Sequence, residues 1–161
     1  MHVDRFATVE IRVHKEQPFA AELSTLLADW GLTNSSQERL WVISYDAIEQ
    51  VRTVIEVAVG GYHEVLVPLP PLLTAVLMAG TDRFQIAHNH PSGDNSPTMF
   101  DIELVSAVMA AANTAGLYFE DSLIVGPGHE TFSFLENGLI VPAADLAARA
   151  EGGHARAPFT R

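Results

Sequence analysis

Two histidines and an aspartate lie close together in this sequence and could bind a metal ion. His88 and His90 are separated by one residue and follow a short apolar stretch, 84–87, that is typical of a strand. Because side chains alternate along a strand, the two imidazoles would point to the same side and could converge on one ion. Asp101 follows a turn-rich segment and falls in the first two turns of the next predicted helix. Its carboxylate could therefore face back toward the imidazoles.

The chemistry of these three side chains favours zinc. Two imidazoles and one carboxylate leave the fourth position of a tetrahedral site open for water, which is the arrangement of catalytic rather than structural zinc sites. A nitrogen-rich set with few ligands suits zinc better than magnesium or calcium. An HxH pair taken alone is a weak signal, because neighbouring histidines often lie unliganded at a surface. The full set predicts one Zn²⁺ per chain, held by His88, His90 and Asp101.

Composition excludes several other kinds of site and partner. The chain has 161 residues, of which 48% are hydrophobic, and it contains no cysteine, so disulfides, cysteine nucleophiles and thiolate metal sites are excluded. The formal net charge is −11 and the nine Lys and Arg residues are scattered, which makes nucleic acid an unfavourable partner. We expect a cytoplasmic protein, since the start lacks the pattern of a signal peptide and prolines interrupt the longest apolar run, 65–80.

The pattern of apolar residues predicts a mixed α and β fold in one domain over 1–142. A short helix and a disordered tail are expected over 143–161. The predicted strands cover 7–14, 38–45, 52–59, 84–87, 119–125 and 131–134. The predicted helices cover 19–30, a segment from Pro70 or Pro71 to about 78, a segment from Pro97, capped by Ser96, to near Gly116, and 143–150.

The segment that carries the three ligands resembles the motif of a known family. The sequence His88-Asn89-His90-Pro91-Ser92-Gly93-Asp94, continued by Pro97-Thr98 and Asp101, is similar to the JAMM (MPN+) metalloprotease motif, and most similar to its RadC-like branch. The resemblance extends over about 38–138 and includes Asp121, Ser133 and Gly138 on the closing strands. It implies an α/β fold of the cytidine-deaminase-like type, an α/β/α sandwich with a central mixed β-sheet (the JAB/MPN domain).

The same resemblance implies a general base. The family places a glutamate on an early strand near the zinc, and Glu38, at the start of the predicted strand 38–45, fits that position. This glutamate would take a proton from the zinc-activated water and pass it to the leaving amine. Spacing alone does not select Glu38 over Glu49, Glu56 or Glu64.

The chain departs from the family pattern at three places. Thr98 stands where the family usually has serine; it keeps the hydroxyl and is predicted to donate to the oxyanion. Ser122 replaces a histidine that commonly follows the equivalent of Asp121. The N-terminal part begins with a predicted strand and helix, without the helix-hairpin-helix character of full RadC proteins, so a DNA-repair role is not implied by the JAB domain.

Several residues of the motif have smaller predicted roles. The main-chain N–H groups of Ser92 and Gly93 are secondary candidates for oxyanion donors. Asn89 is expected to point away from the histidines and to stabilise the turn that follows them. Asp94 is expected to be a turn residue and not a ligand.

The predicted function is a zinc-dependent metallopeptidase or isopeptidase that hydrolyses an amide bond of a peptide or isopeptide-linked protein. One alternative is a catalytically silent zinc-binding interaction domain. A second alternative is a RadC-like DNA-repair accessory protein, which the acidic charge disfavours.

Overall fold

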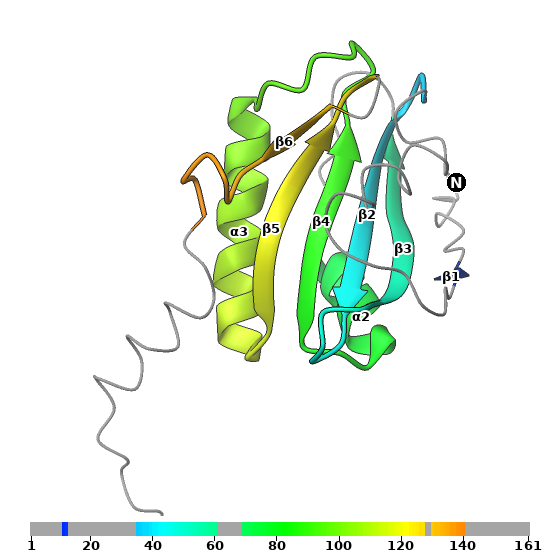
Figure 1. Cartoon of the computed structure of the whole chain (residues 1–161), viewed down its shortest axis with the longest axis vertical. Helices are drawn as coiled ribbons and strands as arrows, with labels where there is room; N and C mark the ends of the chain where they lie inside the picture. The colour runs from blue at the N-terminus through cyan, green and yellow to red at the C-terminus, as the bar shows by residue number, and fades with distance from the viewer. Residues whose placement is uncertain (1–10, 13–34, 61–68, 128–129, 141–161) are drawn as a thin grey trace, which may run out of the picture.

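A mixed β-sheet forms the centre of the structure, a computed structural model that describes residues 11–12, 35–60, 69–127 and 130–140. The strands lie in the order β1-β3-β2-β4-β5-β6 (Figure 1). Among the described strands only β4 and β5 pair in parallel, whereas the other neighbours are antiparallel. The strands are β1 (Ile11–Arg12), β2 (Glu38–Tyr45), β3 (Val51–Gly60), β4 (Arg83–Asn89), β5 (Tyr118–Val125) and β6 (Thr131–Ser133).

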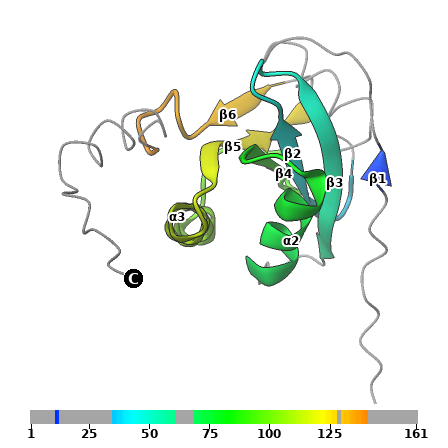
Figure 2. The ribbon, with the colours of Figure 1, turned by 90° about the horizontal axis from the view of Figure 1, so that it is seen from below.

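Two helices, α2 (Leu69–Ala79) and α3 (Met99–Ala115), cover one face of this sheet (Figure 2). The helix α3 is the crossover that a parallel pair such as β4 and β5 requires. One hydrophobic core joins both helices to the sheet, and it includes Leu72, Val76, Val105, Val108 and Ile86. Burying a side chain of this size contributes about 1.5–3 kcal/mol, so the contacts hold α2 and α3 against the sheet.

The opposite face of the sheet is also buried. Trp41, Ile43, Val54, Ala87 and Val125 form a second apolar cluster there, to which neither α2 nor α3 contributes. The α/β class and the mixed sheet that the sequence predicted are therefore confirmed. The predicted helices over 19–30 and 143–150, and most of the predicted strand 7–14, lie outside the described residues. A second helical layer thus stays a prediction.

Most element boundaries lie within about one residue of the predicted ones, and the end of β4 and the start of α3 differ by two residues. Strand β2 has the predicted bounds, and Gly116 ends α3 in the left-handed conformation (φ 71°) that favours glycine. Strand β4 is longer than predicted and includes His88 and Asn89. The prediction that Ser96 caps α3 with Pro97 as its first residue is wrong, because Thr98 is the N-cap.

Pairing between β2 and β4 brings the ends of these strands together. Leu40 lies opposite His88 in this antiparallel pair. Residues two apart share a face, so Glu38 at the start of β2 lies on the same face and at the same end as the histidines. In the part of the chain that the structure describes, no helix is long and apolar enough to cross a membrane.

Candidate metal centre

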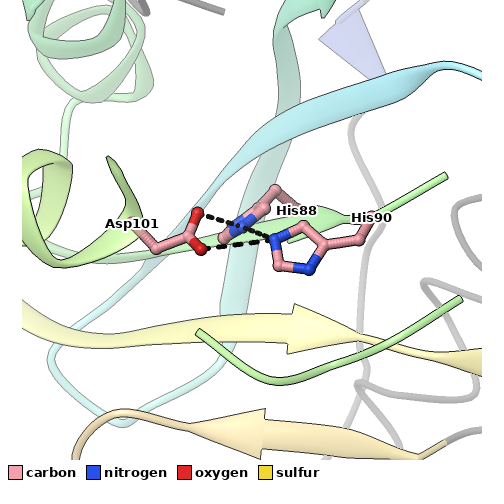
Figure 3. A group of neighbouring side chains, drawn as sticks. All are labelled: His88, His90 and Asp101. Atoms are coloured by element: carbon pink, nitrogen blue, oxygen red, sulfur yellow. Dashed lines mark hydrogen bonds and ion pairs between the residues drawn. The ribbon is translucent and has the colours of Figure 1, made fainter. Parts of the chain in front are cut away.

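Three side chains from the end of β4 and the start of α3 converge on one point (Figure 3). The Nε2 atoms of His88 and His90 are 3.2 Å apart. The Oδ1 atom of Asp101 lies 2.9 Å from His88 Nε2, and its Oδ2 atom lies 3.3 Å from His90 Nε2. One potential ligand atom from each residue thus lies within 4.8 Å of the other two. The predicted ligands form a compact set that could hold a metal.

Asp101 is held by the first turn of α3. It is the third residue of the helix, and its Oδ2 atom accepts hydrogen bonds from the main-chain N–H and the hydroxyl of Thr98, both at 2.6 Å. The Thr98 hydroxyl in turn accepts from the Asp101 N–H at 3.3 Å, which completes a capping box. This reciprocal cap explains why the helix starts after Thr98, and it fixes the carboxylate that faces the histidines.

His90 is oriented by the turn that follows it. Its Nδ1 atom lies 2.7 Å from the carbonyl oxygen of Asp94, so this nitrogen can carry the proton and leave Nε2 free to face the other ligands. The Asp94 carboxylate accepts from the Ser96 N–H, as expected of a turn residue. The Gly93 N–H donates to the carbonyl of His90 at 2.9 Å. Because this N–H group is already engaged within the turn, the bond argues against the predicted role of Gly93 as an oxyanion donor.

His88 is almost fully buried, and its second nitrogen has no partner. Its exposed fraction is 2%, and among the described residues no group bonds to its Nδ1. The hydroxyl of Ser122, at the position where the family commonly has histidine, is likewise buried without a partner there. Ser122 lies opposite Ile86, which is two residues before His88 on β4. The departure at Ser122 therefore leaves a buried hydroxyl that has no partner among the described residues.

Electrostatics couples Asp101 to both imidazoles. Burial alone would raise the pKa of Asp101, but hydrogen bonds from His88 and His90 hold it well below its usual range. The pKa of His90 is raised, chiefly by its hydrogen bond to Asp101 and against the effect of burial. A smaller contribution to the raised pKa of His90 comes from the charge of Glu38, which places that carboxylate within electrostatic reach of the site.

Glu38 differs in position from the other candidate glutamates. Glu49 lies in the turn between β2 and β3 and pairs with Arg83, at the far end of the sheet. Glu56 pairs with Arg39 and lies opposite Trp41, on the face away from the helices. Glu64 is outside the described residues. Of the three described candidates, Glu38 alone lies at the ligand end of β4.

A comparison with known families now bears on this site. The sequence profile of the RadC-like JAB domain matches residues 20–139, which is more than half of the chain. The chain belongs to the RadC-like JAB domain family. This membership confirms the resemblance of the HNHPSGD motif, and the fold agrees with that of a JAB domain.

Individual relatives agree with this JAB domain assignment. A UPF0758 protein of Porphyromonas gingivalis is 30% identical over 109 residues, which cover 68% of this chain and 48% of the relative. A UPF0758 protein of Chloroflexus aurantiacus is 29% identical over 119 residues, which cover 74% of this chain and 51% of the relative. The chain spans about half the length of the curated relatives it matches.

A first prediction concerns the Thr98 hydroxyl. Replacing Thr98 with alanine removes the cap and should destabilise the metal-free protein by about 1 kcal/mol. The loosened Asp101 should also weaken metal affinity by about 10–100-fold, the usual effect of losing a group that orients a ligand. Thermal denaturation and competitive zinc titration measure the two effects. Thr98→Ser keeps the hydroxyl and is the matched control; a serine variant as impaired as the alanine variant would show that the methyl group matters instead.

A second prediction concerns pH. Because the pKa of His90 is raised in the folded state, its protonation stabilises the metal-free protein fully below about pH 6.5, and this contribution is lost as pH rises through the folded pKa. The lowered pKa of Asp101 adds stability above about pH 4 that is lost in acid. The melting temperature of metal-free protein should therefore fall as pH rises above about 6.5, while zinc affinity rises because fewer protons compete with zinc for the ligands. A melting temperature that stays flat across this range would contradict the coupling.

Proposed function

We propose that this chain binds one zinc ion through His88, His90 and Asp101 and hydrolyses an amide or isopeptide bond. The observation that carries this proposal is the convergence of two imidazole Nε2 atoms and one carboxylate at one point. These are zinc-type donors, and their number leaves a coordination position for water or substrate. Two of the ligands also have the supporting hydrogen bonds that are typical of metal sites. His90 Nδ1 bonds to the carbonyl of Asp94, and the Asp101 carboxylate accepts from Thr98.

Zinc would act as a Lewis acid that lowers the pKa of a bound water molecule to roughly 7–9. The chain itself would supply the proton transfer. Glu38 lies on the ligand face of the sheet, and among the described residues no hydrogen bond or ion pair engages its carboxylate. Its carboxylate would accept the proton of the attacking water and deliver it to the leaving amine.

The role of Thr98 in this proposal differs from the one expected of it. Its single hydroxyl proton is donated to Asp101 Oδ2, so the hydroxyl can serve an oxyanion only by giving up this bond. Holding the metal ligand is therefore its primary role in the proposal. Donation to the oxyanion stays a prediction, and it would require the hydroxyl to rotate during the reaction.

The engaged Thr98 hydroxyl also supports a second candidate function. A zinc-binding domain that lacks a free oxyanion donor could bind a partner protein without cleaving it. This silent interaction domain would share the metal site and differ only in turnover. A DNA-related role is compatible with the RadC-like family, but the net charge of −11 opposes binding to phosphates.

Metal analysis and turnover together test the proposal. Purified protein should contain one zinc per chain, and the zinc-loaded form should cleave members of a peptide and isopeptide library that the chelator-treated form leaves intact. Protein that neither contains zinc nor takes it up on titration would contradict both zinc-based functions. Stoichiometric zinc without any cleavage would favour the silent domain, and steeply salt-dependent DNA affinity would support the DNA-related role.

The proposal also covers the substrate, the domain and the location of the chain. A peptide or isopeptide-linked protein is the proposed substrate, since the motif resembles that of JAMM metalloproteases, which hydrolyse amide bonds. A single domain over 1–142 and a cytoplasmic location are proposed on the sequence arguments alone.

A further inference from the structure

Asn89 has a buried side-chain amide, and its side-chain hydrogen bonds reach the segment around Glu38. The residue is 2% exposed and lies at the end of β4, between the two histidines. Its Nδ2 atom donates to the carbonyl oxygens of Ser35 at 3.3 Å and Gln37 at 3.1 Å. Its Oδ1 atom accepts from the N–H of Arg39 at 2.9 Å. The side chain thus does not stabilise the turn after the histidines, as the sequence suggested, but binds the start of β2.

These bonds take over where the β2–β4 ladder stops. The last residue pair of that ladder is Leu40 with His88. The Gln37 carbonyl and the Arg39 N–H belong to the two residues that flank Glu38 in the chain. The Asn89 side chain therefore fixes the backbone on both sides of Glu38 while the two neighbours of Asn89 face the metal centre.

Only an amide satisfies this arrangement. The two carbonyls need donors and the Arg39 N–H needs an acceptor, and an asparagine side chain offers both. An aspartate of the same size could still accept from Arg39, but it would bring a carboxylate against two carbonyl oxygens. An alanine would leave three main-chain groups without their partner in hydrogen bonds that are partly buried, and losing such a partner costs free energy.

We propose that Asn89 is a positioning residue for Glu38, holding the backbone at 37–39 so that the Glu38 carboxylate faces the metal centre. This inference rests on the proposed function, in which Glu38 transfers the proton. Asn89 thus lies on the face of β4 opposite to the metal centre, and it acts on Glu38 through the backbone.

Amide hydrogen exchange tests the bond without any need for activity. In zinc-loaded Asn89→Ala protein, the Arg39 amide should exchange at least about 10-fold faster than in wild type, because it loses its acceptor. Gln85→Ala is the matched control, since Gln85 is another buried amide on the same face of β4 and bonds to Tyr45 instead. This control should leave Arg39 protected. Unchanged Arg39 exchange in Asn89→Ala would overturn the proposal.

A spectroscopic measurement tests the position of Glu38 itself. With Co²⁺ in place of zinc, the paramagnetic ion should broaden the ¹³C signal of the Glu38 carboxylate in wild type and in Gln85→Ala. The broadening should be lost or reduced in Asn89→Ala and Asn89→Asp. Equal broadening in all four proteins would show that Glu38 keeps its place without Asn89, which would overturn the inference even if the chain proved to have no hydrolytic activity.

A double-mutant cycle tests the route by which Asn89 acts. Asn89→Ala should lower kcat by about 10–100-fold, the range that small displacements of a reacting group produce, with KM and zinc content little changed. In a Glu38→Gln background the same substitution should have no further effect on kcat. An equal loss in both backgrounds, or loss of zinc from Asn89→Ala, would overturn the inference. Failure of wild type to cleave any substrate would instead contradict the proposed function, and exchange and broadening would still decide the role of Asn89.

Discussion

Replacing Glu38 with glutamine should lower kcat by about 10²–10⁴-fold, the usual contribution of a general acid–base group. Glutamine cannot accept a proton at neutral pH, so proton transfer is lost. Because it has the same shape as glutamate, the metal centre should remain intact. Since Glu38 is not among the three converging ligands, the variant should keep one zinc per chain. Loss of turnover with retained zinc is therefore the expected signature, measured by steady-state kinetics and metal analysis.

Glu49→Gln is the matched control for this experiment. Glu49 lies in the turn at the opposite end of β2 and pairs with Arg83 at 3.7 Å, away from the metal centre. Its substitution should leave kcat within about 2-fold of wild type, because an exposed ion pair of this kind contributes little. If Glu38→Gln cleaved substrate as fast as this control, Glu38 could not be the base.

Replacing His88 with alanine should weaken zinc binding by more than about 100-fold. Removal of a group that merely orients a ligand costs about 10–100-fold, and His88 is proposed as a ligand itself. Its Nε2 atom lies 2.9 Å from Asp101 and 3.2 Å from His90 Nε2, so the variant keeps only one imidazole at the site. Competitive titration with a chromophoric chelator measures the loss, and turnover should disappear with the metal.

Ile86→Ala separates the loss of a ligand from the loss of packing. Ile86 is fully buried on the same face of β4, two residues before His88. Its truncation should destabilise the protein by about 2–5 kcal/mol through a cavity, but it removes no metal donor. Wild-type zinc affinity in His88→Ala would refute the proposed ligand set. A comparable loss of affinity in Ile86→Ala would mean that packing, and not ligation, controls the site.

The ligand set could be predicted because its information is local in the sequence. His88 lies at the end of a strand and His90 follows its last residue, while Asp101 lies in the first turn of the next helix, so spacing and element type already placed them together. The end of β4 was harder to predict, since polar histidines interrupt the apolar pattern that marks a strand. The structure shows that the strand continues through Asn89 by pairing with β2 and β5.

The start of α3 illustrates two local preferences in competition. Proline is favoured at the first helical position, which suggested that the helix begins at Pro97 with Ser96 as its cap. The reciprocal bonds between Thr98 and Asp101 satisfy the main-chain N–H groups of these two residues and outweigh that preference. The pattern T-x-x-D was visible in the sequence and would have given the correct cap.

The roles of Glu38 and Asn89 could not be derived from local patterns. Glu38 was selected by family resemblance alone, because spacing did not separate it from Glu49, Glu56 and Glu64. The hydrogen bond between Arg39 and Asn89 joins residues 50 positions apart. Only the pairing of β2 with β4 brings such residues together, and no spacing rule within one segment predicts it.

This pairing has a consequence for how preparations of the protein should be judged. The three proposed ligands come from one continuous stretch of chain, His88–Asp101, whereas Glu38 arrives from a distant strand. A molecule in which β2 has separated from β4 can therefore still hold zinc while it lacks the proposed base. Under heat or mild denaturant, hydrolysis should fail before the metal is released. The fraction of molecules that contain zinc will then exceed the fraction that can hydrolyse substrate.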